Sequence, residues 1–406
     1  MKGLVEAYHV LCDVYTNGSF VGEAVKKHSL FSDPASLRVV YGTIENHFLY
    51  EYKISCLTKK TPKKSLSILL KMGMYLIDHM DDMPDYAAVD EVVKLTKSIG
   101  KAPLAGFVNA VLRQYVSAGN DFFPTDETEA LALRSNRPLW LVKRYITECG
   151  KERAIRILSA KGTDQTHLRP SITFGQDALR HYLEENAIEY CETECGFLVS
   201  KVGKVSELLR EGKVTVMSLG SIKISSSVPT DCRELLDMCA APGGKSVYLA
   251  ERINGTIIAC DLYPHRVKLI RSYAERMHVR NIQMIVMDHT LFEPSFEGRF
   301  TSVLLDAPCS GLGTLISNPD VILNRKESDI DEIIEVQRKL IRNGGRYVAN
   351  GGTLVYSTCS DLPSEDEWIV KEFLSEHSDY VLKSESHTEI DEKGGEGYYY
   401  AVLERK

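Results

Sequence analysis

The sequence predicts a three-part chain whose last part is an α/β domain built on a parallel sheet. Apolar residues recur at helical spacing through the first 120 residues, and strand-like runs alternate with helical segments from residue 233 onward. A length of 406 residues fits two or three domains of ordinary size. We therefore expect an all-α domain at 1–122, a helical linker with a small α+β subdomain at 123–228, and the α/β domain at 229–406.

The N-terminal part is predicted to be helical because three segments, at 63–80, 89–95 and 107–115, each place their apolar residues on one helix face. Few β-rich runs interrupt these segments. The stretch at 117–128 is rich in Gly, Asn, Asp and Pro, which is typical of a domain boundary.

The middle part mixes both kinds of pattern. Helical periodicity occurs in places, and short apolar runs lie between the periodic segments. The mixture indicates a small α+β fold. We expect helices at 137–149, 152–161 and 177–187 and strands within 168–174, 196–200 and 211–218.

The C-terminal part alternates between two element types, which is typical of a parallel sheet with helices on both faces. Ligands of such sheets bind beyond the carboxyl ends of the strands, so the small and polar residues that follow each strand are candidate site residues. The longest helix is expected at 327–348. The apolar runs of strand length lie at 234–240, 255–262, 281–288, 300–310 and 351–360.

Composition excludes several classes of protein. No run of about 18 apolar residues is present, which predicts no membrane-spanning helix. The N-terminus lacks the apolar core of a signal peptide, so the ten Cys are expected to be reduced thiols in the cytoplasm. No CxxC pair occurs, and Cys191 and Cys195 lack a second pair, so we expect no metal site.

The net charge of −7 argues against a protein that simply coats nucleic acid, but the charge is uneven along the chain. Residues 1–120 hold 14 Lys and Arg against 12 Asp and Glu, so this part is slightly basic. Lys59, Lys60, Lys63 and Lys64 form a cluster within it. Two interpretations stay open, a solvated loop and a surface that contacts nucleic acid.

The turn after the first predicted strand is suited to a nucleoside-like cofactor. It reads DMCAAPGGKS from Asp237 to Ser246, and its small residues allow a ligand close to the backbone. The phosphate-loop pattern GxxxxGK[ST] is not met, because Cys239 stands where the first Gly is needed, and GxGxxG is also missing. A turn of small residues without either phosphate pattern favours a cofactor that lacks phosphates.

Carboxylates follow the second and third predicted strands, at Asp261 and Asp288. A carboxylate at the second strand end can accept hydrogen bonds from both hydroxyls of a ribose, and one at the third suits an adenine edge. The alternative is that each Asp caps a helix or lies in a turn. Because three successive strand ends carry such signals, we favour the cofactor site.

Two cysteines occupy equivalent positions just after the last two predicted strands. Cys309 lies in DAPCSGLG, which starts at Asp306, and Cys359 lies in YSTCS. A Cys is most often a small buried apolar residue, and a disulfide is disfavoured in a reducing compartment. A thiolate nucleophile with a second thiol or a carboxylate close by fits covalent catalysis.

Four motifs in order resemble those of the NOL/NOP/Sun family, the RNA 5-methylcytosine methyltransferases that use S-adenosyl-L-methionine. They are DMCAAPGGKS, DAPCSGLG, NPD at 318–320 and YSTCS, and the resemblance covers 233–406. VYGTI, LLKMGMYLI and AGFVNAVLR, at 40–44, 69–77 and 105–113, resemble the NusB-like RNA-binding domain of RsmB-type ribosomal RNA enzymes. The resemblance implies a Rossmann-like S-adenosylmethionine-dependent methyltransferase domain that follows a NusB-like domain, with ribosomal RNA as the partner.

The resemblance also implies a role for each site residue. Asp261 would hold the ribose, Asp288 the adenine and Arg266 the methionine end, although Arg266 is equally suited to a helix surface. Asp306 would lie beside both the cofactor and the target base. The cofactor loop would consist of Cys239, Ala240, Ala241, Pro242, Gly243, Gly244 and Lys245.

In the family the Cys of the TC motif, here Cys359, is the nucleophile, and the Cys of the PC motif, here Cys309, assists product release. Attack of the Cys359 thiolate on cytosine C6 makes C5 nucleophilic enough to take a methyl group. Asp306 near N3 can stabilise the charge that develops on the ring, and Lys245 supplies positive charge. Cys309 or a water can remove the C5 proton. The opposite assignment of the thiols stays open, because related methyltransferases that act on DNA use a Pro-Cys cysteine as nucleophile.

The sequence leaves the RNA substrate open. The two Arg that often precede NPD in the family are replaced by Ile316 and Ser317, and the usual DGFF of the tail reads EGYY at 396–399. Small-subunit ribosomal RNA is the first expectation, and transfer RNA is the alternative. A non-catalytic RNA-binding assembly factor is a third interpretation, against which the two cysteines speak. The sequence indicates neither the modified nucleotide nor the oligomeric state.

Overall fold

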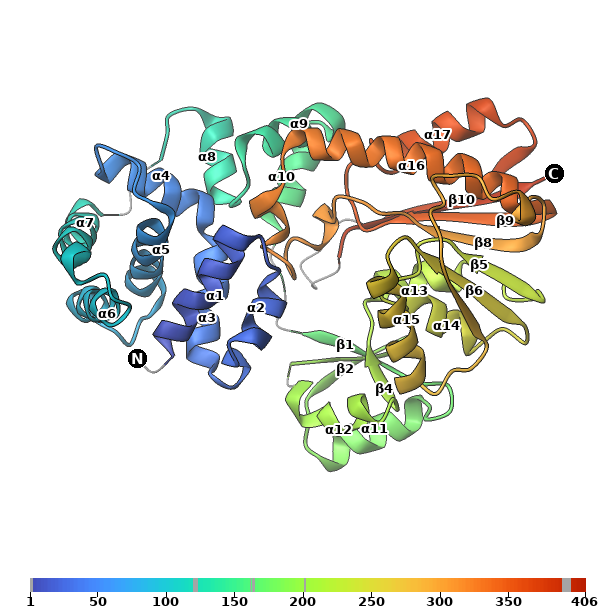
Figure 1. The fold of residues 1–406 in the computed structure, drawn as a ribbon, viewed down its shortest axis with the longest axis horizontal. Coiled ribbons are helices and arrows are strands. Elements are labelled where there is room, and N and C mark those ends of the chain that lie inside the picture. The colour runs from blue at the N-terminus through green and yellow to red at the C-terminus, as the bar shows by residue number, and fades with distance from the viewer. Residues whose placement is uncertain (1–2, 120–122, 161, 163–164, 201, 389–395) are drawn as a thin grey trace. The chain divides into compact units, whose positions relative to one another are not determined.

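The computed structural model describes the chain except for residues 1–2, 120–122, 161, 163–164, 201 and 389–395. The chain forms two compact units, each described here by itself (Figure 1). Unit 1 comprises Met1–Ser159 and Ser317–Glu327, and unit 2 comprises Ala160–Ile316 and Ser328–Lys406. The chain therefore leaves unit 2 after Ile316, contributes the segment 317–327 to unit 1, and returns.

Unit 1 is helical, as the sequence predicts. Its α-helices are α1 (Leu4–Asn17), α2 (Val21–Lys27), α3 (Pro34–Glu45), α4 (His47–Leu57), α5 (Lys64–His79), α6 (Asp85–Ser98), α7 (Ala105–Ala118), α8 (Glu127–Arg134), α9 (Leu139–Cys149) and α10 (Lys151–Ser159). Short 3₁₀ turns are η1 (Leu30–Ser32), η2 (Ala102–Leu104) and η6 (Val321–Asn324). Asp33 begins α3 by accepting a hydrogen bond from the Ser36 backbone N–H, and Pro34 occupies the first turn, where its missing N–H is not needed.

Helix α5 lies at the centre of unit 1. Its residues 68–76 are buried without interruption. A Cβ at Gly42 of α3 would lie 1.9 Å from the Tyr75 ring, and one at Gly73 would lie 2.5 Å from a methyl group of Leu112. Glycine at both positions therefore allows α3 and α7 to approach α5 closely. The sequence predicts α5 from one apolar face, whereas this stretch of the helix is enclosed on all sides.

Helices α8, α9 and α10 belong to unit 1 rather than to the small sheet that follows them. The side chain of Asn136, between α8 and α9, accepts the Phe48 N–H at 2.8 Å and donates to the Ile44 carbonyl at 3.0 Å. The expected boundary at 117–128 falls partly on 120–122, which lie outside the described residues. The three-part division of the chain stays a prediction.

The small α+β fold predicted for the middle part contains an antiparallel sheet of strand order β2-β3-β1-β4. Its elements are β1 (Thr166–Pro170), α11 (Gln176–Glu185), β2 (Tyr190–Thr193), β3 (Gly196–Val199), η3 (Val202–Val205), α12 (Ser206–Arg210), β4 (Val214–Val216) and α13 (Leu219–Ser226). The strand expected within 168–174 ends at Pro170. The reason is a turn, in which the Ser171 hydroxyl accepts the N–H of Phe174.

The C-terminal part has the predicted α/β fold, but its sheet is mixed rather than wholly parallel. The strand order is β10-β11-β9-β8-β5-β6-β7, and β11 runs antiparallel to its neighbours. The strands are β5 (Glu234–Asp237), β6 (Thr256–Asp261), β7 (Ile282–Val286), β8 (Phe300–Asp306), β9 (Val348–Thr358), β10 (Tyr380–Thr388) and β11 (Tyr398–Arg405). The helices and 3₁₀ turns are α14 (Gly244–Ala250), α15 (Pro264–Arg276), η4 (Pro294–Phe296), η5 (Leu312–Thr314), α16 (Glu327–Tyr347) and α17 (Glu367–Glu376).

Helices cover both faces of this sheet, with α13, α14 and α15 on one face and α16 and α17 on the other (Figure 1). The strand order reverses beside β5, because β6 and β7 lie on one side of it and β8 and β9 on the other. Open parallel sheets bind their ligands at such a reversal, outside the carboxyl ends of the strands. In the described part of the chain, every helix is too short or too polar to cross a membrane.

Candidate functional site

The predicted site residues gather at the carboxyl edge of the large sheet. Asp261 is the last residue of β6 and Asp306 the last of β8, while Cys359 directly follows β9. Because β6, β5, β8 and β9 are neighbouring parallel strands, these ends lie on the same edge. The fold therefore brings together the segments that the sequence marks as functional.

The loop 239–245 leads from β5 into α14. Ala240 donates its N–H to the Cys260 carbonyl at 2.8 Å, which fixes the loop to the end of β6. Gly243 has φ 112°, and a Cβ there would lie 3.1 Å from the Cα of Ile270. A side chain at this position would strain the backbone and crowd α15, so the loop needs glycine.

Asp261 binds the backbone of that loop. Its carboxylate is buried, accepts the Ala241 N–H at 3.2 Å and the Tyr263 N–H at 3.4 Å, and pairs with Arg266 Nε at 3.4 Å. Arg266 also donates to the Ala241 carbonyl at 3.2 Å. Tyr263 and not Asp261 occupies the cap position of α15, whereas the contact with the Tyr263 N–H agrees with the alternative of a turn residue.

Asp288 lies two residues beyond β7. Its carboxylate accepts the backbone N–H of Thr290 at 2.9 Å and the Thr290 hydroxyl at 2.6 Å. These contacts form a local turn, which agrees with the alternative of a turn residue. An additional role at an adenine edge stays a prediction.

Lys245 and Asp306 form an ion pair at the end of β8. Asp306 accepts from Lys245 Nζ at 2.7 Å and from the Ser357 hydroxyl at 2.9 Å. Burial disfavours the charged Lys245, but the Asp306 carboxylate outweighs it, so the pKa of Lys245 is raised above its usual value. Lys245 therefore keeps its positive charge next to the Asp306 carboxylate, which is itself partly exposed.

The two cysteines are in contact. Their Sγ atoms are 3.1 Å apart, and the Cys359 backbone N–H also donates to Cys309 Sγ at 3.3 Å. Both are free thiols, and Cys359 is exposed, which contradicts the alternative of a buried apolar residue for Cys359. The hydrogen bond with Cys359 and burial together raise the pKa of Cys309 well above its usual value. Cys309 therefore holds its proton beside the more exposed thiol.

The glycines of the PCSGLG motif hold the Cys309 loop against its neighbours. Gly313 donates its N–H to the Cys359 carbonyl at 3.0 Å, and its own carbonyl accepts the N–H of Gly397 at 2.8 Å. A Cβ at Gly313 would lie 2.0 Å from the Gly397 carbonyl oxygen, so a larger residue would push the loop away. Gly397 belongs to the EGYY tail, which thus supports the cysteine loops.

Sequence reasoning missed a buried carboxylate behind the two cysteines. Glu365 is fully buried and accepts hydrogen bonds from Ser310 and Ser360, the residues that directly follow the two cysteines. The repeated Cys-Ser pair was the available signal, because two serines after equivalent strands call for a shared acceptor when both are buried.

The NPD motif lies in the segment that belongs to unit 1. Asp320 is buried and accepts the N–H of Val21, the first residue of α2, at 2.9 Å. This motif therefore anchors the segment 317–327 on the N-terminal helices. Among the described residues, no group of His, Cys, Asp and Glu has a composition that could hold a metal ion.

Two family models match this chain. The model described as 16S rRNA methyltransferase RsmB/F matches residues 227–403, and the NusB family model matches residues 7–117. The probable ribosomal RNA small subunit methyltransferase B of Bacillus subtilis (strain 168) is 32% identical over 362 residues, which cover 84% of this chain and 80% of that protein. The probable ribosomal RNA small subunit methyltransferase B of a Synechocystis strain is 28% identical over 401 residues, or 92% of this chain and 89% of that protein.

Solved structures share the fold. The crystal structure of PH0851 matches with a TM-score of 0.84 at 23% identity and covers 99% of this chain and 99% of that chain. The structure of NSun6 from Pyrococcus horikoshii with SFG matches with a TM-score of 0.57 at 18% identity and covers 66% of this chain and 98% of that chain. At such identities the likeness concerns the fold alone.

Proposed function

Because this chain belongs to the RsmB/F family of 16S rRNA methyltransferases, we propose that it methylates C5 of a cytosine in small-subunit ribosomal RNA through a covalent adduct at Cys359. As a member of this family it is an S-adenosylmethionine-dependent RNA cytosine-C5 methyltransferase. The observation that supports the covalent route is the pair of thiols, 3.1 Å apart, at the same sheet edge as the Lys245–Asp306 ion pair.

The donor set at the strand ends fits S-adenosylmethionine. A carboxylate has about four acceptor positions, and the Ala241 N–H, the Tyr263 N–H and Arg266 occupy three of those on Asp261, so one is left for a ribose hydroxyl. In this proposal the loop 239–245 surrounds the cofactor, Asp288 meets the adenine and Arg266 the methionine end. When bound, the cofactor supplies an electrophilic methyl group.

The chain's own residues make the cytosine reactive in this proposal. The Cys359 thiolate adds to C6 and forms a C6–S bond, and the former C5–C6 π electrons move through the ring toward N3. In this proposal the Lys245–Asp306 pair meets the edge of the ring, where the positive charge of Lys245 stabilises the negative charge. C5 is then electron-rich and takes the methyl group.

The adduct must next lose the C5 proton. Removal of this proton restores the C5–C6 double bond and expels the Cys359 thiolate from C6. Cys309, whose Sγ lies 3.1 Å from that of Cys359, is placed to act on this proton. Its thiol first gives its own proton to a water, and the thiolate so formed then takes the C5 proton. C5 and C6 are adjacent ring atoms, so two thiols that serve them must also lie close together.

A methylation assay tests the substrate. The purified chain is incubated with tritium-labelled S-adenosylmethionine and either small-subunit ribosomal RNA or transfer RNA, and the product is mapped by bisulfite sequencing. We expect one protected cytosine in the ribosomal RNA. Protection in transfer RNA alone would favour the transfer RNA alternative, and failure to transfer label to either RNA would favour a non-catalytic assembly factor.

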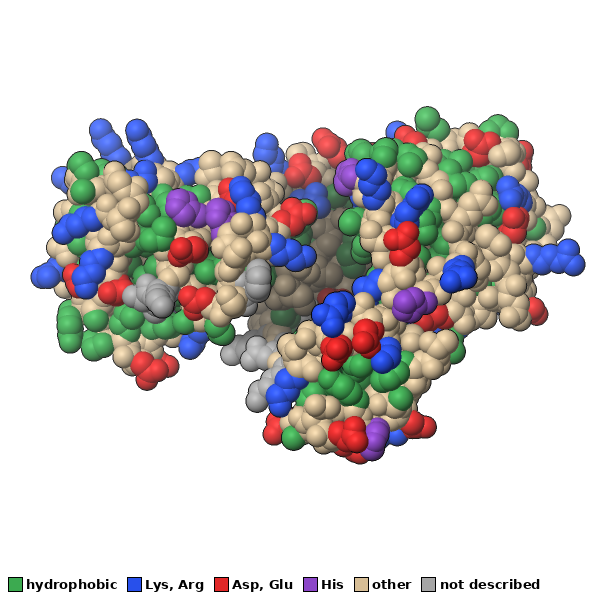
Figure 2. All heavy atoms as spheres, turned by 60° about the horizontal axis from the view of Figure 1, so that its bottom comes forward, with side chains coloured by type: hydrophobic (Ala, Val, Ile, Leu, Met, Phe, Trp, Pro, Cys, Tyr) green, Lys and Arg blue, Asp and Glu red, His purple; other side chains and the backbone are tan. Residues whose placement is uncertain are grey.

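Unit 1 is proposed to contribute RNA affinity, which agrees with the NusB family match. In the view of Figure 2, Lys and Arg side chains are interspersed with Asp and Glu, so no charge of single sign dominates that face. RNA contact by this unit would therefore depend on local clusters. One such cluster lies where α4 passes into α5 and consists of the exposed side chains of Lys59, Lys60, Lys63 and Lys64.

Two further predictions from the sequence stay proposals. They are the three-part division at 1–122, 123–228 and 229–406 and a cytoplasmic location.

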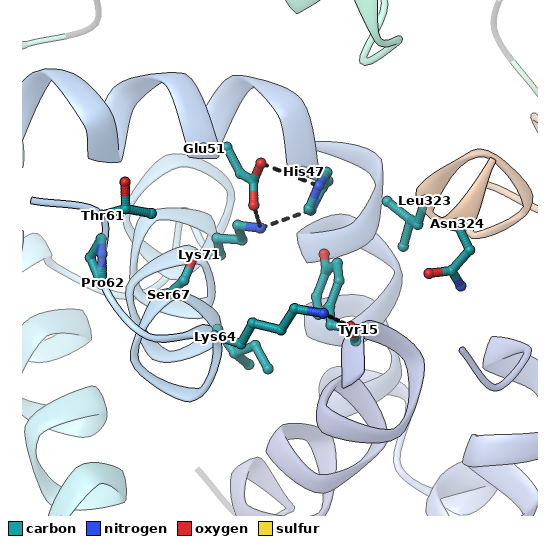
Figure 3. Close-up of a pocket in the computed structure, with 11 residues that line it drawn as sticks. Tyr15, His47, Glu51, Thr61, Pro62, Lys64, Ser67, Lys71, Leu323 and Asn324 are labelled. Atoms are coloured by element: carbon teal, nitrogen blue, oxygen red, sulfur yellow. Dashed lines mark hydrogen bonds and ion pairs between the residues drawn. The ribbon is translucent and has the colours of Figure 1, made fainter. Parts of the chain in front are cut away.

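A pocket of about 370 Å³ opens beside this cluster (Figure 3). Lys64 lines it, and the buried Lys71 donates to Glu51 at 2.9 Å and to His47 Nδ1 at 2.8 Å. Burial lowers the pKa of His47 to about 3, so its neutral ring can accept this hydrogen bond. Leu323, from the segment 317–327, also lines the pocket. Lys64 of the cluster therefore borders a polar hollow on this part of unit 1.

Replacing Lys59, Lys60, Lys63 and Lys64 by Ala is expected to weaken RNA binding and to flatten its salt dependence. Each phosphate contact that is lost lowers the slope of log K against log salt by about 0.7–0.9, so four contacts amount to roughly 3. Filter binding between low and moderate salt measures the slope, and S-adenosylmethionine affinity should stay unchanged.

The matched control neutralises Lys94 and Lys97, which are exposed on α6 of the same unit. This control should keep the wild-type slope. An unaltered slope in the four-lysine variant would show that the cluster is a solvated loop.

A further inference from the structure

We propose that Glu365 is a positioning residue that holds the two cysteine loops in the geometry that the reaction uses. It lies between β9 and α17 and is 0% exposed. The inference rests on the proposed function, because it assigns Glu365 to the reaction of Cys309 and Cys359. It adds a residue that acts through its neighbours and not on the substrate.

The Glu365 carboxylate is bound from both cysteine loops. Its Oε2 accepts from Ser310 Oγ at 2.5 Å and from Ser360 Oγ at 2.6 Å. Its Oε1 accepts from the Ser310 backbone N–H at 2.8 Å and from Gln337 Nε2 at 3.2 Å. These serines directly follow the two cysteines, so one carboxylate joins the two loops within one residue of each thiol.

The same local turn occurs in both loops. An ionised carboxylate can only accept, so both serine hydroxyls donate to Glu365 and leave their lone pairs for other donors. Ser310 Oγ accepts the Leu312 N–H at 3.4 Å, and Ser360 Oγ accepts the Leu362 N–H at 3.2 Å. Glu365 therefore orients two hydroxyls, each of which closes a turn next to a cysteine.

The burial of the Glu365 carboxylate is compensated by hydrogen bonds. A buried charge is costly unless hydrogen bonds replace its water, and four donors meet Glu365. Two of these donors come from Ser310 and one from Ser360, so separation of the loops would leave part of the charge without partners. The carboxylate thus resists movement of either loop away from the other.

The link that Glu365 makes between the two cysteine loops is called the clamp below. It matters because Cys309 and Cys359 are proposed to act on C5 and C6, which are adjacent atoms of one base. Backbone hydrogen bonds already join the loops, from Ala307 to the Ser357 carbonyl at 2.8 Å and from Gly313 to the Cys359 carbonyl at 3.0 Å. The first bond lies on the strand side of the thiols, and the second joins Gly313, beyond Cys309, to Cys359 itself. Glu365 adds a link between the two serines that directly follow the cysteines.

The variant Glu365→Gln tests the clamp with nearly unchanged size. The amide NH₂ would face either the two serine hydroxyls or the Ser310 N–H and Gln337 Nε2, so in both orientations two donors lose their acceptor. The matched control is Glu372→Gln, because Glu372 on α17 pairs with Arg338 and Arg342 at 2.8 and 2.9 Å and is not part of the cysteine loops.

The experiment measures the effective concentration of the Cys309 thiol toward the Cys359 thiol, which sets how readily the two form a disulfide. The full chain is equilibrated with mixtures of reduced and oxidised glutathione, which accepts the two electrons, and the Cys309–Cys359 disulfide is quantified by peptide mapping. We expect Glu365→Gln to lower this effective concentration by about fivefold or more, because loosened loops hold the thiols together for less of the time. Glu372→Gln should leave it unchanged.

A kinetic measurement gives the second criterion. We expect kcat of Glu365→Gln to fall about three- to tenfold, while KM for S-adenosylmethionine stays within about twofold. An unchanged effective thiol concentration would overturn the proposal whatever happens to kcat. If Glu365→Gln does not fold, Ser360→Ala removes one arm of the clamp, and the same criterion applies to it. The thiol measurement needs no RNA, so it still tests the clamp if the proposed methylation fails.

Discussion

Replacing Cys359 by Ala is expected to abolish methyl transfer, whereas replacing Cys309 by Ala is expected to trap a covalent protein–RNA complex. Without the Cys359 thiolate there is no attack on C6, so C5 never becomes nucleophilic and no adduct forms. Without Cys309 the attack and the methyl transfer can proceed, but proton removal from C5 is hindered. The adduct then accumulates because the thiolate cannot leave.

The structure agrees with this order of events. Cys359 is the exposed thiol, and Cys309 has a pKa raised well above its usual value by its hydrogen bond with Cys359 and by burial. A thiol that holds its proton is a poor nucleophile, whereas the thiolate of a group with a raised pKa is a strong base once it forms, so Cys309 suits removal of the C5 proton better than attack. Cys359, which follows β9 directly, is the better candidate for the first bond to cytosine.

A denaturing gel of the reaction with labelled RNA measures the adduct, which appears as a slow band that nuclease removes. The control is Cys191→Ala, because Cys191 is another exposed free thiol and lies on β2 of the small sheet. Adduct from Cys359→Ala with none from Cys309→Ala would reverse the two roles. If both thiols only contribute packing, each change would cost about 1 kcal/mol of stability and leave methylation intact.

The variant Asp261→Ala is expected to lower S-adenosylmethionine affinity by at least about tenfold with the fold retained. A hydrogen bond to a charged group contributes roughly 1.5–3 kcal/mol, and about 1.4 kcal/mol corresponds to tenfold in affinity. The variant also removes the acceptor for the Ala241 N–H, so the loop 239–245 loses its tie to the end of β6. Both losses act on cofactor binding.

Isothermal titration calorimetry with S-adenosylmethionine measures this effect. Asp231→Ala is the matched control, because Asp231 is exposed and precedes β5, on the amino side of the same sheet. It should bind like the wild type. Asp261→Ala with wild-type affinity would exclude a role of this carboxylate in the cofactor site, and a loss of the thermal unfolding transition would mean that the tie to the loop is needed for folding.

The carboxyl edge of the sheet could be predicted from the sequence because strand ends are local signals. Asp261, Asp306 and Cys359 each follow an apolar run of strand length, and parallel pairing places such ends on one edge. The long helix α16 was likewise predicted from its periodicity at 327–348 and lies at Glu327–Tyr347. These features depend on residues that are near one another in the chain.

The remaining features depend on distant partners and were therefore not predicted. The proposed role of Glu365 depends on its hydrogen bonds with Ser310, which is far from it in the sequence and lies on another loop. β11 pairs antiparallel with both β10 and β9, and the sequence predicts strands only up to residue 360. The roles of the individual site residues stay predictions, since proximity at one edge does not by itself assign chemistry.

The segment 317–327 has a consequence for how the chain can fold during its synthesis. Unit 1 includes residues up to Ser159 together with this segment, so its first part is made long before its last. Until Asp320 is available, the buried Val21 N–H lacks its acceptor, and the apolar core lacks the contact that Leu323 makes with it. A domain that is encoded first generally folds first on the ribosome, but this one stays incomplete until residue 327 has emerged. A gene fragment that stops at Ser159 would therefore encode the helices of unit 1 without the segment 317–327 that packs against them.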